Sequence, residues 1–217
     1  MLSTNPCPRG YLLGGEKMNN QQNKNLNKFI KISLLGAIAV VLMYFDFPIP
    51  FLPFPWLKID LSDIPALMGA FAFGPMAGVL IELLKNLLIL IVKGTGTGFV
   101  GEMANFIVGV SLVAPAAWVY NRNKSKKTAI LGMILGTICI EVVGIIANVY
   151  FLLPAYGMQM APNEIVQYVT IGLLPFNGIK SIMVCGITYV LYKKVSLAIF
   201  KVDSKLDNRR KGSLGSV

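Results

Sequence analysis

Six apolar stretches dominate this sequence, and they restrict the chain to folds that bury long runs of hydrophobic side chains. The stretches cover approximately residues 28–45, 63–73, 75–91, 100–120, 128–153 and 166–192. An α-helix needs about 20 apolar residues to cross a bilayer, and most of these stretches come near that length or exceed it. The stretch 63–73 is short because Gly74-Pro75 interrupts it, and a short helix is tolerated at membrane depth when protein covers its ends. We therefore predict an all-α integral membrane protein with six transmembrane helices.

The composition excludes several classes of protein. Hydrophobic residues make up 55% of the chain and charged residues only 14%, whereas a soluble domain carries about 25% charged residues. The absence of histidine removes Ser-His-Asp and Cys-His catalytic systems and histidine-ligated metals. Cys7, Cys139 and Cys185 are scattered without the spacing of a disulfide framework or a thiolate metal site. We expect no metal site.

Positive charge is concentrated between the apolar stretches and gives the chain a net charge of +10. Clusters of Lys and Arg lie before the first stretch, between the fourth and fifth, and after the sixth. Such clusters stay on the cytoplasmic side of a membrane, and an even number of spans then places both termini in the cytoplasm. The basic charge therefore indicates orientation in a membrane rather than binding of nucleic acid.

This pattern divides the chain into three parts. We expect a polar N-terminal tail over residues 1–26, a six-helix membrane domain over residues 27–195 and a polar cytoplasmic tail over residues 196–217. The first residues lack the apolar core of a signal peptide. Met18, which is followed by Asn, Gln and Lys, could be the native start.

A proline-rich loop over residues 47–60 is the most unusual segment. Its four prolines forbid a helix and favour extended backbone, and its apolar neighbours require cover from water. The loop could be an aromatic belt at the membrane interface or a lid over a ligand pocket. Its stiff backbone and the embedded Lys58 favour the lid slightly.

Several charged residues lie inside the predicted spans, where each isolated charge costs roughly 3 kcal/mol. Glu82 and Lys85 are three residues apart, so they share a helix face and can pair. This pair could be structural, could contact a ligand or could serve coupling. Glu141 has no partner nearby in the sequence and could pair with Lys85 or Lys180 across the bundle.

Four polar residues are predicted at a similar depth in the outer half of the bundle. They are Asn105, Asn148, Asn177 and Lys180. Hydrogen bonds between helices would account for one or two of them. All four together, beneath the proline-rich loop, favour a pocket for a flat, neutral or weakly anionic ligand that forms many hydrogen bonds.

Two further patterns bear on function. The segment 96–101 matches G-x-G-x-x-G but lacks the strand and helix of a dinucleotide site, and no P-loop is present, so we expect no ATP hydrolysis by this chain. Small residues at Ser33, Gly36 and Ala37 allow close helix approach, either within the protein or to another membrane protein.

The sequence resembles the substrate-binding S components of energy-coupling factor (ECF) vitamin transporters over about residues 28–195. The resemblance is carried by Phe-Pro-Ile-Pro-Phe at 47–51, Leu-Lys-Ile-Asp-Leu-Ser-Asp-Ile-Pro-Ala-Leu at 57–67, Phe-Gly-Pro-Met-Ala-Gly at 73–78 and Glu-Leu-Leu-Lys-Asn at 82–86. The proline-rich loop together with the last of these motifs is most similar to the riboflavin-specific type. The resemblance implies a six-helix membrane protein with both termini inside the bacterial cell. It further implies a subunit that binds riboflavin without catalysis and docks onto a transmembrane coupling subunit (T component) and two ABC ATPases.

The same resemblance implies roles for individual residues. Asn177 and Lys180 would contact the flavin from the sixth helix, Asn148 from the fifth, and Leu57 and Lys58 from the lid. The family docks onto its partner through an Ala-x-x-x-Ala face on the first helix, a spacing that Ser33 and Ala37 meet here with Gly36 adjacent.

Other functions remain open at this point. The chain could be an S component for another vitamin or for a flavin such as FMN. An intramembrane enzyme that uses Glu82, Glu141 and Lys85 as acid and base groups is the remote alternative, and the lack of histidine and of paired carboxylates opposes it. We therefore predict that the chain is not an enzyme and has no catalytic cofactor.

Overall fold

A computed structural model describes residues 10–96 and 98–191, and helices account for most of them. The helices and the two short strands have the following bounds: α1 Gly10–Tyr44, β1 Phe47–Pro48, β2 Lys58–Ile59, α2 Asp63–Phe73, α3 Pro75–Lys93, α4 Val100–Arg122, α5 Lys126–Ala147, π-helix η1 Asn148–Leu152, α6 Leu153–Ala155, α7 Pro162–Gln167 and π-helix η2 Tyr168–Leu173. Helical structure continues without a break from Pro162 to Leu191, and we call this segment the C-terminal span. The predicted cytoplasmic tail over residues 196–217 lies outside the described residues.

Among the residues that the structure describes, five segments are long and apolar enough to cross a membrane. They are Asn25–Tyr44, Pro75–Lys93, Val100–Arg122, Lys126–Ala155 and the C-terminal span. The sixth predicted span is α2, whose 11 residues extend only about 16 Å at 1.5 Å per residue. Gly74 ends α2 with φ of 102°, a conformation that suits glycine, and Pro75 begins α3. Of the six predicted spans, five correspond to helices of membrane length in the described residues, and the sixth corresponds to the short helix α2.

Protein surrounds the short helix α2. Ala66, Leu67 and Ala70 are fully buried, and α1, α3 and α4 all pack against α2. A Cβ atom on Gly78 of α3 would lie 2.6 Å from the Cβ of Ala70, so only glycine permits this approach. Because protein encloses this short helix, the backbone polar groups at its ends are not exposed to lipid.

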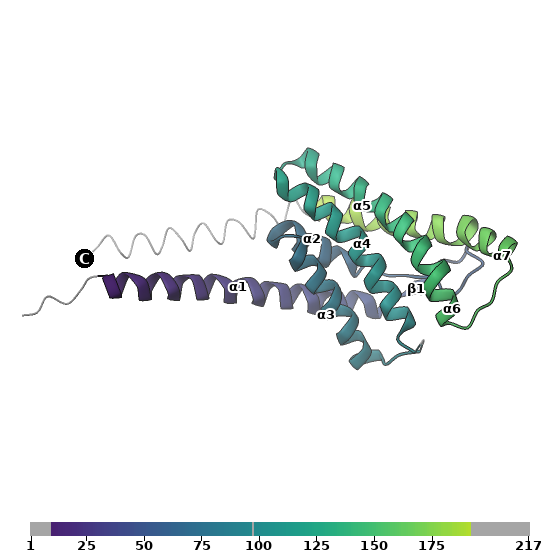
Figure 1. The fold of residues 1–217 in the computed structure, drawn as a ribbon, viewed down its shortest axis with the longest axis horizontal. Helices are drawn as coiled ribbons and strands as arrows, with labels where there is room; N and C mark the ends of the chain where they lie inside the picture. The colour runs from purple at the N-terminus through teal and green to yellow at the C-terminus, as the bar shows by residue number, and fades with distance from the viewer. Residues whose placement is uncertain (1–9, 97, 192–217) are drawn as a thin grey trace, which may run out of the picture.

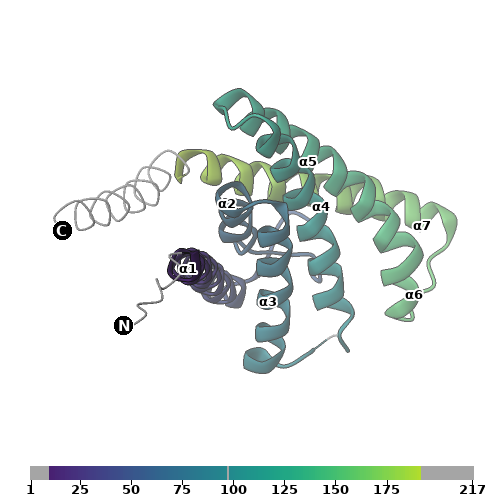
Figure 2. The same cartoon turned by 60° about the vertical axis from the view of Figure 1, so that its left-hand side comes forward.

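Helices α1 and α4 pack against both α2 and α3, and α5 packs against α4 (Figure 1). Helices α4 and α5 form an antiparallel pair whose connecting loop lies at the end of the bundle opposite to α6 and α7 (Figures 1 and 2). Helix α1 begins at Gly10, well before the predicted start near residue 28, because no proline interrupts residues 10–44. Its apolar part, Asn25–Tyr44, agrees with the predicted span.

The proline-rich loop folds back onto the helical bundle. Its ends pair as antiparallel strands, with Phe47 opposite Ile59 and Pro48 opposite Lys58. Between and within these strands, Ile49, Leu52, Leu57 and Ile59 are buried in one cluster with residues of the C-terminal span. The loop therefore covers protein, as a lid does, and we call residues 45–62 the lid loop.

Candidate ligand-binding site

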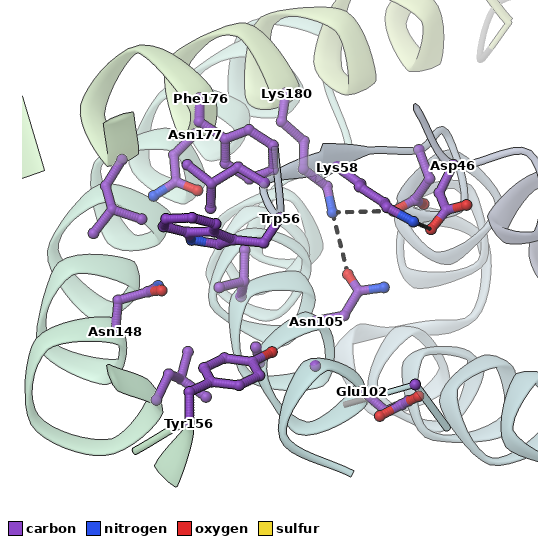
Figure 3. A pocket seen from close by; sticks show the side chains of 18 of the residues that line it. Asp46, Trp56, Lys58, Glu102, Asn105, Asn148, Tyr156, Phe176, Asn177 and Lys180 are labelled. Carbon is purple, nitrogen blue, oxygen red and sulfur yellow. Dashed lines mark hydrogen bonds and ion pairs between the residues drawn. The ribbon is translucent and has the colours of Figure 1, made fainter. Parts of the chain in front are cut away.

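A cavity of about 480 Å³ lies beneath the lid loop. Its walls come from the lid loop, the end of α3, the start of α4, the segment η1–α6 and the C-terminal span (Figure 3). The volume lies within the range of about 300–1,000 Å³ that is usual for sites of small organic ligands.

The five residues predicted to bind a ligand all line this cavity. They are Leu57, Lys58, Asn148, Asn177 and Lys180, and Asn105 joins them. Asn177 and Lys180 are buried and reach the cavity from the C-terminal span (Figure 3). The structure thus brings together polar residues that are up to about 120 positions apart in the sequence.

Lys180 is held by three acceptors from three different segments. Its Nζ lies 3.0 Å from Oδ2 of Asp63 in α2 and 3.6 Å from Oδ2 of Asp60 in the lid loop. The same Nζ donates a hydrogen bond of 3.2 Å to Oδ1 of Asn105 in α4. Only 3% of the Lys180 side chain is exposed, so these contacts balance its charge inside the protein.

Asn148 is held in place by contacts on both sides of its amide. Its Nδ2 donates to the carbonyl of Gly144 at 2.8 Å, and its Oδ1 accepts a hydrogen bond of 3.1 Å from the hydroxyl of Tyr168. Asn148 begins the π-helix η1 and Tyr168 begins η2. Short π segments occur often at functional sites, and here both contribute side chains to the cavity.

Aromatic side chains form a further part of the cavity wall. The ring centroids of Phe54 and Tyr168 lie 4.9 Å apart in an edge-to-face arrangement, and the ring centroids of Trp56 and Tyr168 lie 6.3 Å apart. Trp56, Tyr168 and Phe176 all line the cavity. This wall suits a flat, largely apolar ring system. Sequence reasoning missed Tyr168, because a tyrosine in an apolar span is equally typical of an interfacial anchor.

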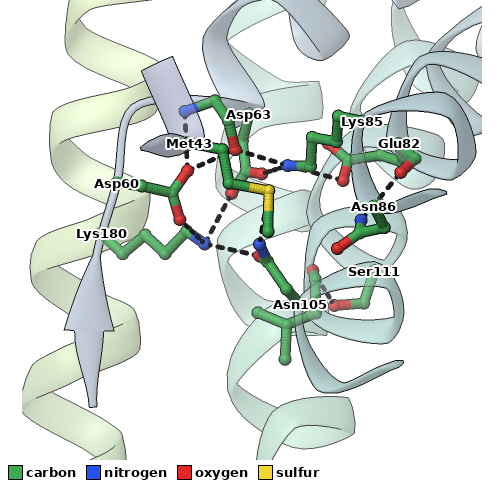
Figure 4. Close-up of polar contacts among 11 residues, drawn as sticks. Met43, Asp60, Asp63, Glu82, Lys85, Asn86, Asn105, Ser111 and Lys180 are labelled. Atoms are coloured by element: carbon green, nitrogen blue, oxygen red, sulfur yellow. Dashed lines mark hydrogen bonds and ion pairs between the residues drawn. The ribbon is translucent and has the colours of Figure 1, made fainter. Parts of the chain in front are cut away.

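A buried ionic cluster lies next to the polar residues that line the cavity (Figure 4). Nζ of Lys85 lies 2.8 Å from Oε2 of Glu82 and forms an ion pair with Oδ1 of Asp63, and all three side chains are fully buried. Nζ of Lys85 also donates to Ser62 at 2.8 Å. The predicted Glu82–Lys85 pair is therefore present, but it belongs to a larger network.

Asp60 and Asp63 lie at or just before the start of the apolar stretch of α2 but are only 4% and 0% exposed, since they face the buried lysines Lys85 and Lys180. One expectation about this region was wrong. The described residues contain no ion pair between Glu141 and either Lys85 or Lys180. Glu141 instead faces the C-terminal span, where its Oε1 lies near Gly178.

A second set of ion pairs closes the rim of the cavity. Asp46, which follows α1, lies 2.6 Å from Nζ of Lys93 at the end of α3 and 3.6 Å from Nζ of Lys58 on β2. These groups are partly exposed, so each pair contributes at most about 1 kcal/mol.

The predicted docking residues separate into two groups. Ser33 and Ala37 are exposed on α1, beside exposed apolar side chains such as Leu34 and Ile38. Gly36 is buried instead, and a Cβ atom there would lie 3.6 Å from Leu84 of α3. Gly36 therefore serves packing inside the protein and does not share the exposed face.

The fold and the cavity define a class: a helical membrane protein that holds a small-molecule pocket beneath a loop at one end. Across residues 10–96 and 98–191, no group of three or more His, Cys, Asp or Glu side chains is placed to hold a metal ion. Residues 27–192 match the family of the ECF transporter, substrate-specific component. The chain belongs to this family and is therefore a multi-pass protein of the bacterial membrane.

Individual relatives agree with the family. The chain is 41% identical to the riboflavin transporter RibU of Staphylococcus aureus (strain TCH60) over 187 residues, which covers 84% of this chain and 96% of the relative. It is 35% identical to the riboflavin transporter FmnP of Bacillus subtilis (strain 168), with 78% and 92% covered. A solved structure described as the S component of a bacterial ECF transporter superposes with a TM-score of 0.71 at 41% identity, covering 82% of this chain and 98% of that one.

Proposed function

We propose that this chain is the riboflavin-binding S component of an ECF-type importer. It captures the vitamin at the outer face of the bacterial membrane. The observation that carries the proposal is the composition of the cavity beneath the lid loop, where the buried Lys180 and three asparagines line the same space as several aromatic side chains. The similarity to riboflavin transporters of S. aureus and B. subtilis supports riboflavin as the ligand.

The chemistry of the lining fits the chemistry of riboflavin. The isoalloxazine ring is flat and carries two carbonyls and an imide N–H on one edge. Asn148, Asn177 and Lys180 supply donors for the carbonyls, and an asparagine oxygen can accept from the imide. Trp56 and Tyr168 offer ring faces or edges to the apolar part of the ligand. Leu57 and Lys58 contact it from the lid loop.

The proposed topology follows from the distribution of charge. The basic loop between α4 and α5 contains Lys124, Lys126 and Lys127, and we place it in the cytoplasm. The opposite end of the bundle, with the cavity, then faces outward. Together with α2 as a short sixth helix, this puts both termini inside and makes residues 27–195 the membrane domain, with polar tails over 1–26 and 196–217.

Energy for transport comes from partners in this proposal. A T component and two ABC ATPases bind the loaded S component, and the chain itself catalyses no reaction and carries no catalytic cofactor. Ser33 and Ala37 on the exposed face of α1 are the proposed contacts with the T component. The Glu82–Lys85 pair belongs to the interior and is proposed to be structural.

The test is an absorbance spectrum of the detergent-purified protein followed by a riboflavin fluorescence-quench titration. We expect saturable quenching at one riboflavin per protein, with FMN as the competing ligand in a parallel titration. Asn177→Ala and Lys180→Ala should each weaken riboflavin binding about tenfold or more, since a hydrogen bond to a charged or buried group is lost. A colourless protein without quenching contradicts the proposal. Tighter binding of FMN than of riboflavin would identify FMN, the phosphate ester of riboflavin, as the preferred ligand.

A further inference from the structure

Lys180 presents a buried ammonium group to the cavity from the C-terminal span. A lysine side chain has four rotatable bonds, so its direction is set by its partners rather than by its own stiffness. Two of the three partners are carboxylates, at 3.0 Å in Asp63 and 3.6 Å in Asp60. The third is the amide oxygen of Asn105, which itself lines the cavity.

Asp63 is the nearer of the two carboxylates and is itself fixed. One of its oxygens faces Lys180, and the other forms an ion pair with Lys85 of α3. It is fully buried and lies in the first turn of α2, where the helix dipole favours a negative charge. Asp63 does not line the cavity, so any effect of Asp63 on a ligand must pass through another residue.

The arrangement leaves one direction open to Lys180. An ammonium group has three N–H donors. The two carboxylate partners of Lys180 are Asp63, which does not line the cavity, and Asp60, which does line it (Figure 4). The remaining donor faces Asn105 and the cavity (Figure 3). A ligand carbonyl in the cavity could replace or share this neutral acceptor without breaking either ion pair.

We infer that Asp63 is a positioning residue for ligand binding, which holds the Lys180 ammonium toward the cavity while Lys85 fixes Asp63 from the other side. The inference rests on the proposed function, because it assigns a role to the ion pair behind one of the proposed ligand contacts. Through these two ion pairs, the carboxylate of Asp63 links α2 to both α3 and the C-terminal span.

A double-mutant cycle tests this inference, with riboflavin affinity measured by fluorescence quenching on the full-length detergent-purified protein. We expect Asp63→Asn and Lys180→Met each to weaken binding about tenfold or more, as for loss of a charged hydrogen bond. In the Lys180→Met background, Asp63→Asn should change affinity less than about twofold, because residues that act through one another are not additive. Independent, additive losses would overturn the inference, as would wild-type affinity in Asp63→Asn.

Glu82→Gln is the matched control. Glu82 is as buried as Asp63 and also contacts Lys85, but it has no contact with Lys180 among the described ion pairs. We expect its affinity to stay within about threefold of wild type, because Glu82 neither pairs with Lys180 among the described ion pairs nor lines the cavity, so its loss leaves the contacts of Lys180 in place. An equal loss in Glu82→Gln and Asp63→Asn would indicate a general effect of the cluster on folding and would overturn the assignment to Asp63.

A second variant covers the case in which Asp63→Asn does not fold. Asp63→Glu keeps the charge but moves the carboxylate by one methylene, and misplacement of a supporting group by about 1 Å is enough to weaken a site. We expect about a fivefold loss of affinity that disappears in the Lys180→Met background. Wild-type affinity in Asp63→Glu would overturn the inference alone, whereas a wild-type protein that does not bind riboflavin would overturn the proposed function as well.

Discussion

Gly109 of α4 lies directly against the carboxylate of Glu82, and this contact fixes how closely α4 approaches α3. A Cβ atom on residue 109 would lie 2.6 Å from Cδ of Glu82, a distance that carbon atoms do not tolerate. Glu82 is fully buried and tied to Lys85, so it cannot move aside without disturbing the ionic cluster. The glycine is therefore part of how the membrane domain accommodates a buried carboxylate.

Gly109→Ala should consequently lower the stability of the protein. We expect a loss of about 1–3 kcal/mol, typical of overpacking in a dense interior, measured as a lower midpoint of thermal unfolding in detergent. Gly186→Ala is the control, because Gly186 is exposed on the C-terminal span and nothing lies within 4 Å of its added Cβ. Equal midpoints for the two variants would contradict the close contact at Gly109.

Single residues also show where sequence reasoning succeeds and where it fails. The Glu82–Lys85 pair was predictable, because two opposite charges three residues apart in an apolar span have few other charged partners nearby. The burial of Asp60 and Asp63 was not, since a carboxylate just before an apolar stretch is typical of a membrane boundary. Only the fold of the lid loop over these side chains places them inside, and no local pattern encodes that.

Among the elements, the two π-helices are those most closely tied to the cavity. A π turn adds one residue to the helical repeat and re-aims the side chains next to it. Through η1 and η2, Asn148 and Tyr168 come within hydrogen-bond distance although 20 residues separate them in the sequence. The bond fixes the Asn148 amide, which the proposed function assigns to the ligand.

Tyr168→Phe tests the importance of this link. The ring remains for packing, but the hydrogen bond of 3.1 Å to Asn148 is lost. We expect riboflavin affinity to fall about three- to tenfold, in line with roughly 1 kcal/mol for a neutral hydrogen bond, in a fluorescence-quench titration. Tyr150→Phe is the matched control, because Tyr150 is 72% exposed. An unchanged affinity in Tyr168→Phe would mean that the hydroxyl does not organise the site.

The lid loop depends on a glycine in the C-terminal span. Phe54 of the loop lies where a Cβ atom on Gly172 would stand, at 2.7 Å from its Cδ2. Gly172→Ala should therefore push Phe54 outward and weaken closure of the lid. We expect bound riboflavin to dissociate about fivefold faster, the factor that corresponds to 1 kcal/mol of overpacking.

Dissociation can be followed by chasing bound riboflavin with an excess of a non-fluorescent flavin analogue in a stopped-flow experiment. Gly186→Ala again serves as the control, since it adds the same methyl group to the same span in open space. A dissociation rate that is the same in both variants would show that the contact between Phe54 and Gly172 does not hold the lid.

The elements themselves were largely predictable, and their irregularities were not. Gly74-Pro75 and the apolar runs predicted the bounds of α2 exactly as residues 63–73 and placed α3 and α4 within two residues. The π segments escaped prediction because apolar periodicity over a long helix does not distinguish one inserted residue from a regular turn. The lid was left undecided for a similar reason, since its apolar residues fit both a membrane interface and a protein surface.

At the scale of the whole molecule, the two ends of the bundle carry different groups. The end with the α4–α5 loop carries Arg122, Lys124, Lys126 and Lys127, and the opposite end carries the lid loop and the cavity (Figure 1). Under the proposed orientation, the cavity opens outward and the basic loop lies inside. The capture of ligand and the contact with the ATPases would then occur at opposite faces of the membrane.

Docking onto a partner requires a surface away from the cavity, and the exposed side of α1 is the proposed one. Ser33 and Ala37 lie four residues apart on this side, where small side chains allow another helix to approach closely. Neither residue lines the cavity. A bulky side chain at either position should therefore obstruct the partner while leaving the ligand site intact.

Ser33→Trp and Ala37→Trp separate the two activities. We expect riboflavin affinity of the purified protein to stay within about twofold of wild type, because sites without shared contacts behave independently, while ATP-dependent uptake by the complex in proteoliposomes falls at least about tenfold. Ile182→Trp, at a position on the C-terminal span that is 71% exposed, controls for the effect of an added tryptophan in the membrane. Normal uptake by both α1 variants would exclude this side of α1 as the docking surface, whereas a parallel loss of riboflavin affinity would show that α1 and the cavity are not independent.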